Sequence, residues 1–347
     1  MPKVNEKSRD YWATRFMQLE EAKHNKSLIA LKELQEIYDK AEAQIDNDIN
    51  AWYNRVAKNN NISMHEAKLL LDKAELKEFK WKVKDYIKYG EENALNQAYM
   101  RELENASARV HISRLEALKI QARNTIEVMA DSKAKKITGY LGELYTDNYY
   151  HSAFEIQKGF NLGWDLQTID NKRLENVLSK PWAKDGKNFS DRIWTDKNKL
   201  INTVYSELSQ SMIMGKNPNK VVKKISQIMG VDRNTVSRLV MTESSYISSV
   251  SQKDCFNDLD VERYEFVATL DSKTSEICRE WDGEVILMKD YNPGVTAPPL
   301  HVYCRSVTAP YFDDNYSERI VGGGSNAEFI DSSITYKEWQ DKYVLKK

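Results

Sequence analysis

The sequence has 347 residues, enough for two or three domains with buried cores. Its 51 Lys and Arg residues nearly balance 52 Asp and Glu residues, so the net charge of -1 points to no class of partner. Three cysteines are too few for a disulfide framework. No run of about 18 apolar residues predicts a membrane span, and the N-terminal MPKVNEKSRDYW lacks the apolar core of a signal peptide. We therefore expect a soluble protein made inside the cell.

Long helices are expected over most of the chain, because glycine and proline, which interrupt helices, number only 13 and 7. Residues 8–130 fit this expectation. In ASARVHISRLEALKIQARNTIEVMA, apolar residues recur at steps of three and four: Leu115, Leu118, Ala122, Ile126 and Met129. This spacing gives one apolar stripe on a charged helix. Acidic residues alternate with the lysines, which favours a helix bundle or hairpin arm over a membrane-surface helix.

Residues 131–255 are also expected to be helical, with clearer boundaries. Ser190 is a candidate N-cap, and Gly215 is placed to end the helix that follows. The apolar side of that helix would hold Ile193, Leu200, Val204, Leu208 and Met212.

Charge is uneven in the second half of the chain. Residues 172–239 hold 14 Lys and Arg against 6 Asp and Glu, whereas residues 240–347 hold 11 against 19. The two regions are either solvated faces of opposite sign or a basic face for a phosphate backbone and an acidic face for another partner. The candidate nucleic-acid contacts are Lys216, Lys220, Lys223, Lys224, Arg233 and Arg238.

Residues 221–241, VVKKISQIMGVDRNTVSRLVM, imitate a DNA-reading helix-turn-helix. The pattern predicts a helix that ends at Gly230, a turn at residues 231–232 and a second helix that carries Arg233 and Arg238. Any two short amphipathic helices joined by a glycine turn give the same pattern. No dimerisation zipper or second copy accompanies it, so a transcription regulator is the minor alternative.

The apolar period changes near residue 262. In RYEFVATL, the alternation of Tyr264, Phe266, Ala268 and Leu270 with other residues predicts a half-buried strand. A short helix over 275–281, a turn at 282–283, the strand EVILM and the strand YCRSVTAPY are expected to follow. The predicted fold class is therefore mainly α, with long helices in the N-terminal half and a small α+β unit whose short sheet lies around 262–312.

The last residues are predicted to form a linker and a docking tail. GGGS at 322–325 is typical of a flexible linker. In ITYKEWQDKYV we expect a short amphipathic helix that exposes Ile334, Trp339 and Val344. The sequence thus divides into four segments, namely a charged helical region at 1–130, a helical region at 131–255, the α+β unit at 256–315 and the tail at 316–347.

Cys278, His301 and Cys304 offer two thiolates and an imidazole around the small sheet. Zinc favours four tetrahedral ligands, and the fourth would be Asp271 or Asp282. A turn within PPLHVYCR would let His301 and Cys304 bind the same ion. Alternatively the cysteines pack as small buried residues, the commonest fate of a free cysteine, and His301 bonds a backbone carbonyl. A third possibility is that one cysteine is a redox or catalytic thiol. We expect the three side chains to meet in space, and the sequence leaves their role open. Cys255 is interpreted as structural.

These residues carry a family resemblance. The segment TLDSKTSEICR, the Asp-Gly turn at 282–283 and PPLHVYCR resemble the Mu F-like head-morphogenesis proteins, the minor capsid proteins of tailed bacteriophages. LVMTESSYIS is similar to the family's Arg-Thr-Glu segment, with Met241 where arginine is usual. The resemblance covers roughly residues 135–312, so residues 131–255 would form the helical half of a Mu F-like domain.

The resemblance implies a minor head protein, assembled in the host bacterial cytoplasm and carried in the virion, in the capsid interior or at the portal vertex. The implied work is head assembly, DNA packaging or DNA ejection, without turnover. The implied partners are the portal protein, scaffolding or major capsid protein, and double-stranded DNA bound without sequence preference. The competing prediction is an enzyme, a metal-dependent nuclease or a toxin-like domain with His301 and the cysteines at its centre.

Overall fold

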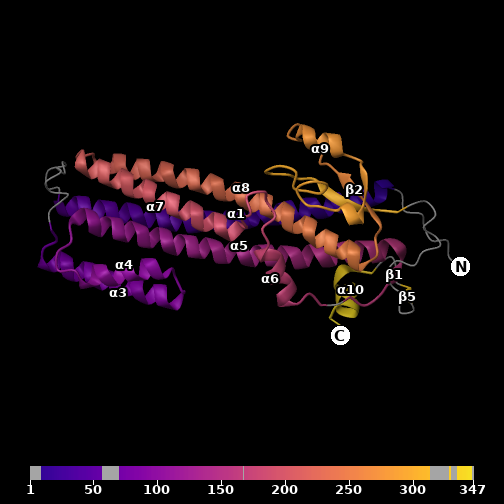
Figure 1. Ribbon diagram of the computed structural model, residues 1–347, viewed down its shortest axis with the longest axis horizontal. Coiled ribbons are helices and arrows are strands. Elements are labelled where there is room, and N and C mark those ends of the chain that lie inside the picture. Colours follow the sequence, from indigo (N-terminus) through magenta and orange to yellow (C-terminus); the bar gives the residue numbers. More distant parts are fainter. Residues whose placement is uncertain (1–8, 57–69, 167, 313–327, 330–333, 346–347) are drawn as a thin grey trace. The chain divides into compact units, whose positions relative to one another are not determined.

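The computed structural model describes residues 9–56, 70–166, 168–312, 328–329 and 334–345. The longest helices are α1 (Arg9–Val56), α5 (Arg114–Phe160) and α8 (Pro218–Asp258). A three-stranded antiparallel sheet lies in the C-terminal part (Figure 1). The predicted fold class is confirmed. Among the described helices, none combines the length and the apolar character that a membrane span requires.

The chain divides into two compact units, and each is discontinuous in sequence. Unit 1 takes the described residues within Met1–Leu31, Ile137–Phe189 and Ser237–Lys347, and unit 2 takes those within Lys32–Lys136 and Ser190–Val236. The helices α1, α5 and α8 therefore contribute to both units. The division of the sequence into four segments stays a prediction.

The described part of unit 2 is helical. Beside its shares of the long helices, it contains α3 (Lys73–Glu92), α4 (Gln97–Ala108) and most of α7 (Phe189–Ile213). Asp72 begins α3 with a capping box that it shares with Glu75. The chain turns at Ala94, whose φ is 50°, and α3 and α4 then lie side by side (Figure 1).

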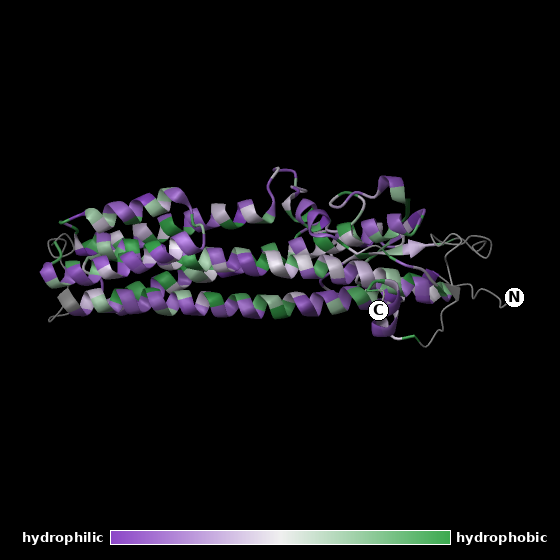
Figure 2. Cartoon of the chain, turned by 90° about the horizontal axis from the view of Figure 1, so that it is seen from below, coloured by the Kyte–Doolittle hydropathy of each residue, from purple (hydrophilic) through white to green (hydrophobic). Residues whose placement is uncertain are grey.

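The predicted apolar stripes are buried. Hydrophilic and hydrophobic residues are interspersed along the helices (Figure 2). In α5 the buried residues include Leu118, Ala122, Ile126 and Met129, and in α7 they include Ile193, Leu200, Val204, Leu208 and Met212. α7 begins one residue before the predicted cap. It ends before Gly215, whose φ of 63° suits a glycine after a helix.

The helix-turn-helix prediction was wrong, because α8 runs unbroken through residues 221–241. Gly230 lies inside the helix. Asp232, predicted in the turn, is buried and accepts hydrogen bonds from Tyr38 and Lys133. A glycine in a helix interior costs about 1 kcal/mol relative to alanine, which tertiary packing of the helix outweighs.

Unit 1 combines helices with the sheet. Its central strand β2 (Arg263–Val267) pairs antiparallel with β3 (Val285–Leu287) and with β4 (Val307–Tyr311). The further elements are β1 (Leu162–Gly163), α6 (Asn171–Ser179), α9 (Glu276–Trp281), the 3-10 turn η1 (Met288–Asp290), β5 (Glu328–Phe329) and α10 (Tyr336–Tyr343). β1 pairs with β5.

The sheet carries buried residues on both faces, unlike the half-buried strand that alternation predicts. Tyr264 and Phe266 are buried as expected, but Glu265 and Val267 are buried too. Leu270 was expected on the buried side and is 63% exposed, because β2 ends at Val267.

The tail was expected to expose its aromatic side chain, and this expectation was wrong. Trp339 of α10 is fully buried in the core of unit 1, and its Nε1 donates a hydrogen bond of 2.7 Å to Gln157 Oε1. Val344 is buried and Ile334 is partly buried. The glycine run at 322–325 lies outside the described residues.

Candidate metal centre

Cys278, His301 and Cys304 meet in unit 1, as expected from the sequence. One potential ligand atom of each lies within 4.8 Å of the other two. The two sulfur atoms are 3.8 Å apart, and both cysteines are free thiols. Their side chains are 2% and 3% exposed, whereas His301 is partly buried. The cluster is thus a donor set with two dry sulfurs and an imidazole nearer to solvent.

The helix α9 positions Cys278. Ser275 caps this short helix, and its side chain accepts a hydrogen bond of 3.3 Å from the Cys278 amide. Cys278 faces a small apolar cluster that also contains Phe266, Ala268 and Cys304. Packing within this apolar cluster fixes the direction of the Cys278 thiol.

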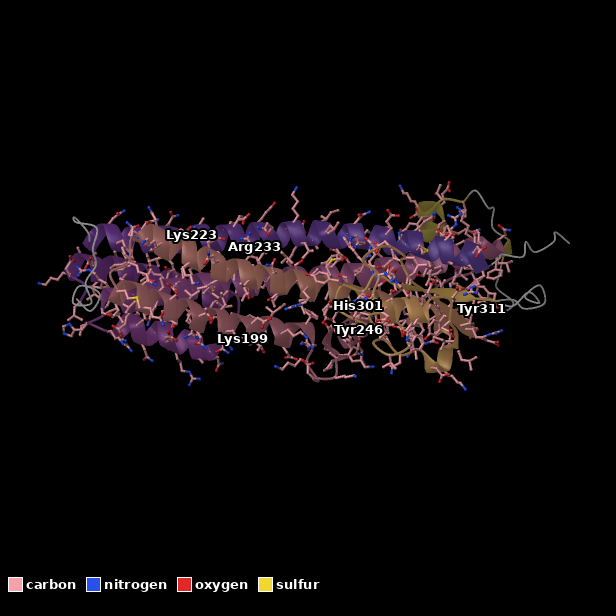
Figure 3. The ribbon with its side chains drawn as sticks, turned by 90° about the horizontal axis from the view of Figure 1, so that it is seen from above. Lys199, Lys223, Arg233, Tyr246, His301 and Tyr311 are labelled. Atoms are coloured by element: carbon pink, nitrogen blue, oxygen red, sulfur yellow. The ribbon has the colours of Figure 1, made fainter. Side chains whose placement is uncertain are left out.

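A tight turn positions His301 and Cys304. The Cys304 amide donates to the His301 carbonyl (3.3 Å), and Tyr303 has a φ of 60°. Residues three apart on a straight strand face opposite ways, so the turn is what lets both side chains meet one point. The Tyr303 amide also donates to Thr242 Oγ1 of α8 (3.4 Å). Figure 3 labels His301 and a second α8 residue, Tyr246.

The tautomer of His301 follows from its backbone contact. The ring Nδ1 lies 2.7 Å from the Val302 carbonyl oxygen. A carbonyl only accepts, so Nδ1 carries the proton in this contact, and Nε2 is the ring nitrogen that a metal ion would take. Metal-binding histidines in proteins are usually fixed in this way.

Hydrogen bonds shift the pKa values of the two thiols in opposite directions. The hydrogen bond from Cys278 lowers the pKa of Cys304 against the effect of burial, and bonds from His301 and from the amides of Ser306 and Leu300 lower it further. The same bond to Cys304, together with burial, raises the pKa of Cys278. The bond to Cys304 also raises the pKa of His301. Of the two thiols, Cys304 is the one whose thiolate form these hydrogen bonds favour.

The two aspartates predicted as a fourth ligand have other partners. Asp271 Oδ1 lies 2.7 Å from Arg305 Nη2 and accepts from the Lys273 amide (2.8 Å). Asp282 Oδ1 accepts from the Ala268 amide (2.8 Å). Within the described residues, neither carboxylate joins the group of potential ligands. The hydrogen bonds of both carboxylates thus stabilise the loops beside the three potential ligands.

Sequence reasoning missed the α1 residues near this centre. Glu20 and Lys23 form a buried ion pair, and burial raises the pKa of Glu20 to about 7. The charges of Cys304 and Arg305 also act on Glu20, which places α1 close to the cluster. No signal in one sequence could join residues this far apart.

The six candidate nucleic-acid contacts differ in whether an acidic side chain already pairs with them. Lys216 pairs with Glu207 (3.2 Å), and Arg233 pairs with Asp39 and Glu42 (3.0 and 3.2 Å). The remaining four are exposed, namely Lys220, Lys223 and Lys224 in unit 2 and Arg238 in unit 1. Figure 3 labels Lys223 and Arg233 on α8. The three exposed lysines lie together in the first two turns of α8.

One family model matches the chain. Residues 202–309 match the model described as Phage Mu protein F like protein. The matched region starts in α7, includes α8 and ends in β4, so it contains the three residues of the cluster. No curated protein and no solved structure matches the chain.

Proposed function

Because residues 202–309 match the model described as Phage Mu protein F like protein, we propose that the chain is a minor head protein of a tailed bacteriophage. The observation that carries this proposal is the match itself. It includes Thr242 and the 301–304 turn, which are in contact. The family is one of structural head proteins, and head morphogenesis without turnover is the role that this supports.

The proposed place of the protein is the portal vertex or the capsid interior, in few copies. The portal protein is the proposed main partner, with scaffolding or major capsid protein as further partners. The assembly takes place in the host cytoplasm. These assignments rest on the family match and on the long charged helices, which suit a protein that contacts several others.

Purified virions and portal-containing precursors test this role. Quantitative mass spectrometry should find the protein in both, at a copy number far below that of the major capsid protein. A phage that lacks the gene should assemble defective or non-infectious heads. Absence of the protein from virions and from precursors would end the proposal.

We also propose that unit 2 contacts packaged DNA through phosphates. Lys220, Lys223 and Lys224 are exposed at the start of α8. Lysines bind phosphate as point charges and read no sequence, and the unbroken α8 supplies no recognition helix after a turn. Binding should therefore be uniform over sequences and should weaken as salt rises.

A matched pair of triple variants tests the DNA contact. Replacing Lys220, Lys223 and Lys224 by glutamine should lower the slope of log K against log salt by roughly 2–3, at about 0.9 per phosphate contact. The control removes three exposed lysines of α3 in the same unit, Lys73, Lys77 and Lys84, and should change the slope little. Equal losses in both variants, or a footprint on one sequence, would contradict the proposal.

The competing function, a metal-dependent nuclease, is favoured by the cluster of three metal donors. Purified protein should leave DNA and RNA intact in zinc, magnesium and manganese. Cleavage that disappears in His301→Ala, with folding retained, would replace the assembly role by an enzymatic one.

A further inference from the structure

We propose that Cys278, His301 and Cys304 bind one zinc ion through three protein ligands and leave the fourth position to water. This inference is independent of the role in the phage head. It concerns what holds the small sheet, α9 and the 301–304 turn together.

The sulfur positions fit a tetrahedral zinc ion. Two thiolates bound at about 2.3 Å, with the tetrahedral angle between the bonds, lie about 3.8 Å apart. The sulfur atoms of Cys278 and Cys304 are 3.8 Å apart. A disulfide needs a separation of about 2.05 Å, so the thiols would have to move much closer to be oxidised.

The imidazole fits as the third ligand. Its donor atom belongs to the group in which all ligand atoms lie within 4.8 Å of one another. The bond from Nδ1 to the Val302 carbonyl fixes the plane of the ring and leaves Nε2 as the nitrogen that would bind the ion.

The surroundings suit a bound thiolate pair. Phe266 and Ala268 share the buried cluster with both cysteines, and Trp281 and Leu300 pack against it. The amides of Ser306 and Leu300 hydrogen bond to Cys304. Such bonds stabilise sulfur that carries negative charge, and the apolar walls keep water from the sulfurs.

The fourth position is open because, among the described residues, no further side chain joins the group of potential ligands. Asp271 is bound to Arg305, and Asp282 is bound to the Ala268 amide. In the part of the chain that the structure describes, the group of potential ligands has three members. His301 is the partly exposed member, so water can reach the ion from its side.

The first experiment measures metal in the full-length protein, purified from zinc-supplemented cells without chelator. We expect about one equivalent of zinc. After exchange with cobalt, the protein should show the thiolate-to-cobalt charge-transfer band in the near ultraviolet and the strong visible bands of a tetrahedral site. Fewer than about 0.1 equivalents of zinc and no charge-transfer band would overturn the proposal.

Variants assign the ligands. Cys278→Ser, Cys304→Ser and His301→Gln should each lose most of the bound metal. The matched control is Cys255→Ala, since Cys255 is equally buried but lies in α8 outside the cluster. Where a variant fails to fold, the cobalt spectrum of the protein without substitutions still shows whether cysteine thiolates bind the metal. Equal metal content in Cys278→Ser and Cys255→Ala would overturn the assignment.

Two further outcomes are informative. Chelator should lower the melting temperature of the full-length protein but not that of folded Cys304→Ser, since metal binding contributes directly to folding free energy. Mass spectrometry of alkylated protein should find both thiols reduced. A disulfide between them in freshly isolated protein would overturn the zinc site, while leaving the presence of the protein in virions untouched.

Discussion

Lys133 Nζ lies 2.9 Å from Asp232 Oδ2, and both side chains are buried in unit 2. Tyr38 donates to the same carboxylate, and Lys133 also donates to the Tyr38 hydroxyl (2.9 Å). The three residues come from α5, α8 and α1. Burial lowers the pKa of Lys133, against the effect of Asp232. The contact fixes the register of three helices, because a shift of any one would leave a buried charge without its partner.

Asp232→Ala should therefore destabilise the protein by about 3–5 kcal/mol, the usual cost of leaving one member of a buried ion pair alone. Urea unfolding followed by circular dichroism measures this. The double variant Lys133→Met with Asp232→Leu should recover most of the loss. Lys88→Ala is the control, because Lys88 and Glu92 are exposed and 3.9 Å apart, and such a pair contributes about 0–1 kcal/mol. A loss for Asp232→Ala as small as that of the control would refute the argument.

Gly230→Ala should stabilise the protein by about 0.5–1 kcal/mol, because alanine is the better helix former and the added Cβ meets no atom within 4 Å. Gly159→Ala should destabilise it, since its Cβ would collide with the Trp12 ring. Chemical denaturation compares the two. Destabilisation by Gly230→Ala would favour a turn at this glycine and revive the helix-turn-helix prediction.

Trp339→Ala should cost about 3–5 kcal/mol, as expected for a fully buried tryptophan, and it also removes the hydrogen-bond donor to Gln157 Oε1. The melting temperature of unit 1 should fall accordingly. Trp81→Ala is the matched control, because Trp81 is 75% exposed in α3. A neutral Trp339→Ala would support the earlier idea of a tail that docks elsewhere.

His24→Gln should flatten the dependence of stability on pH below neutrality. Burial lowers the pKa of His24 from 6.5, and the charges of Lys23 and Arg305 lower it further. The folded state then binds fewer protons than the unfolded state, so this contribution is present above pH 6.5 and is lost as pH falls through the folded pKa. Unfolding between pH 7.5 and 5 tests the slope, with the exposed His111→Gln as control. An unchanged slope in His24→Gln contradicts the prediction.

The apolar spacing and turn residues of the sequence predicted those features of the fold that depend on residues close together in the chain. The spacing of Leu118, Ala122 and Ile126 marks the buried side of α5, and the Asp-Gly turn at 282–283 marks the boundary between α9 and β3. The meeting of the cysteines with His301 was also predictable, because all three bracket one short sheet.

Long-range contacts escaped prediction. Aspartate is common in turns, which is why Asp232 was predicted in one. Its hydrogen bonds come from Tyr38 and Lys133, which lie far away in sequence and gave no local signal. Trp339 resembled an exposed docking residue because its partner Gln157 lies in another helix. The same limit applies to Asp271, whose carboxylate is taken by Arg305 instead of by the candidate metal site.

The discontinuity of the units sets an order of folding during synthesis. Unit 2 is complete once Val236 has left the ribosome, whereas unit 1 still needs Ser237–Lys347. Phe16 of α1 packs against Phe256, and Trp12 packs against Phe312, so both early side chains wait for partners translated much later. At about 5–20 residues per second this wait lasts roughly 10–60 s. Chaperones or premature association would therefore act on nascent unit 1 and not on unit 2.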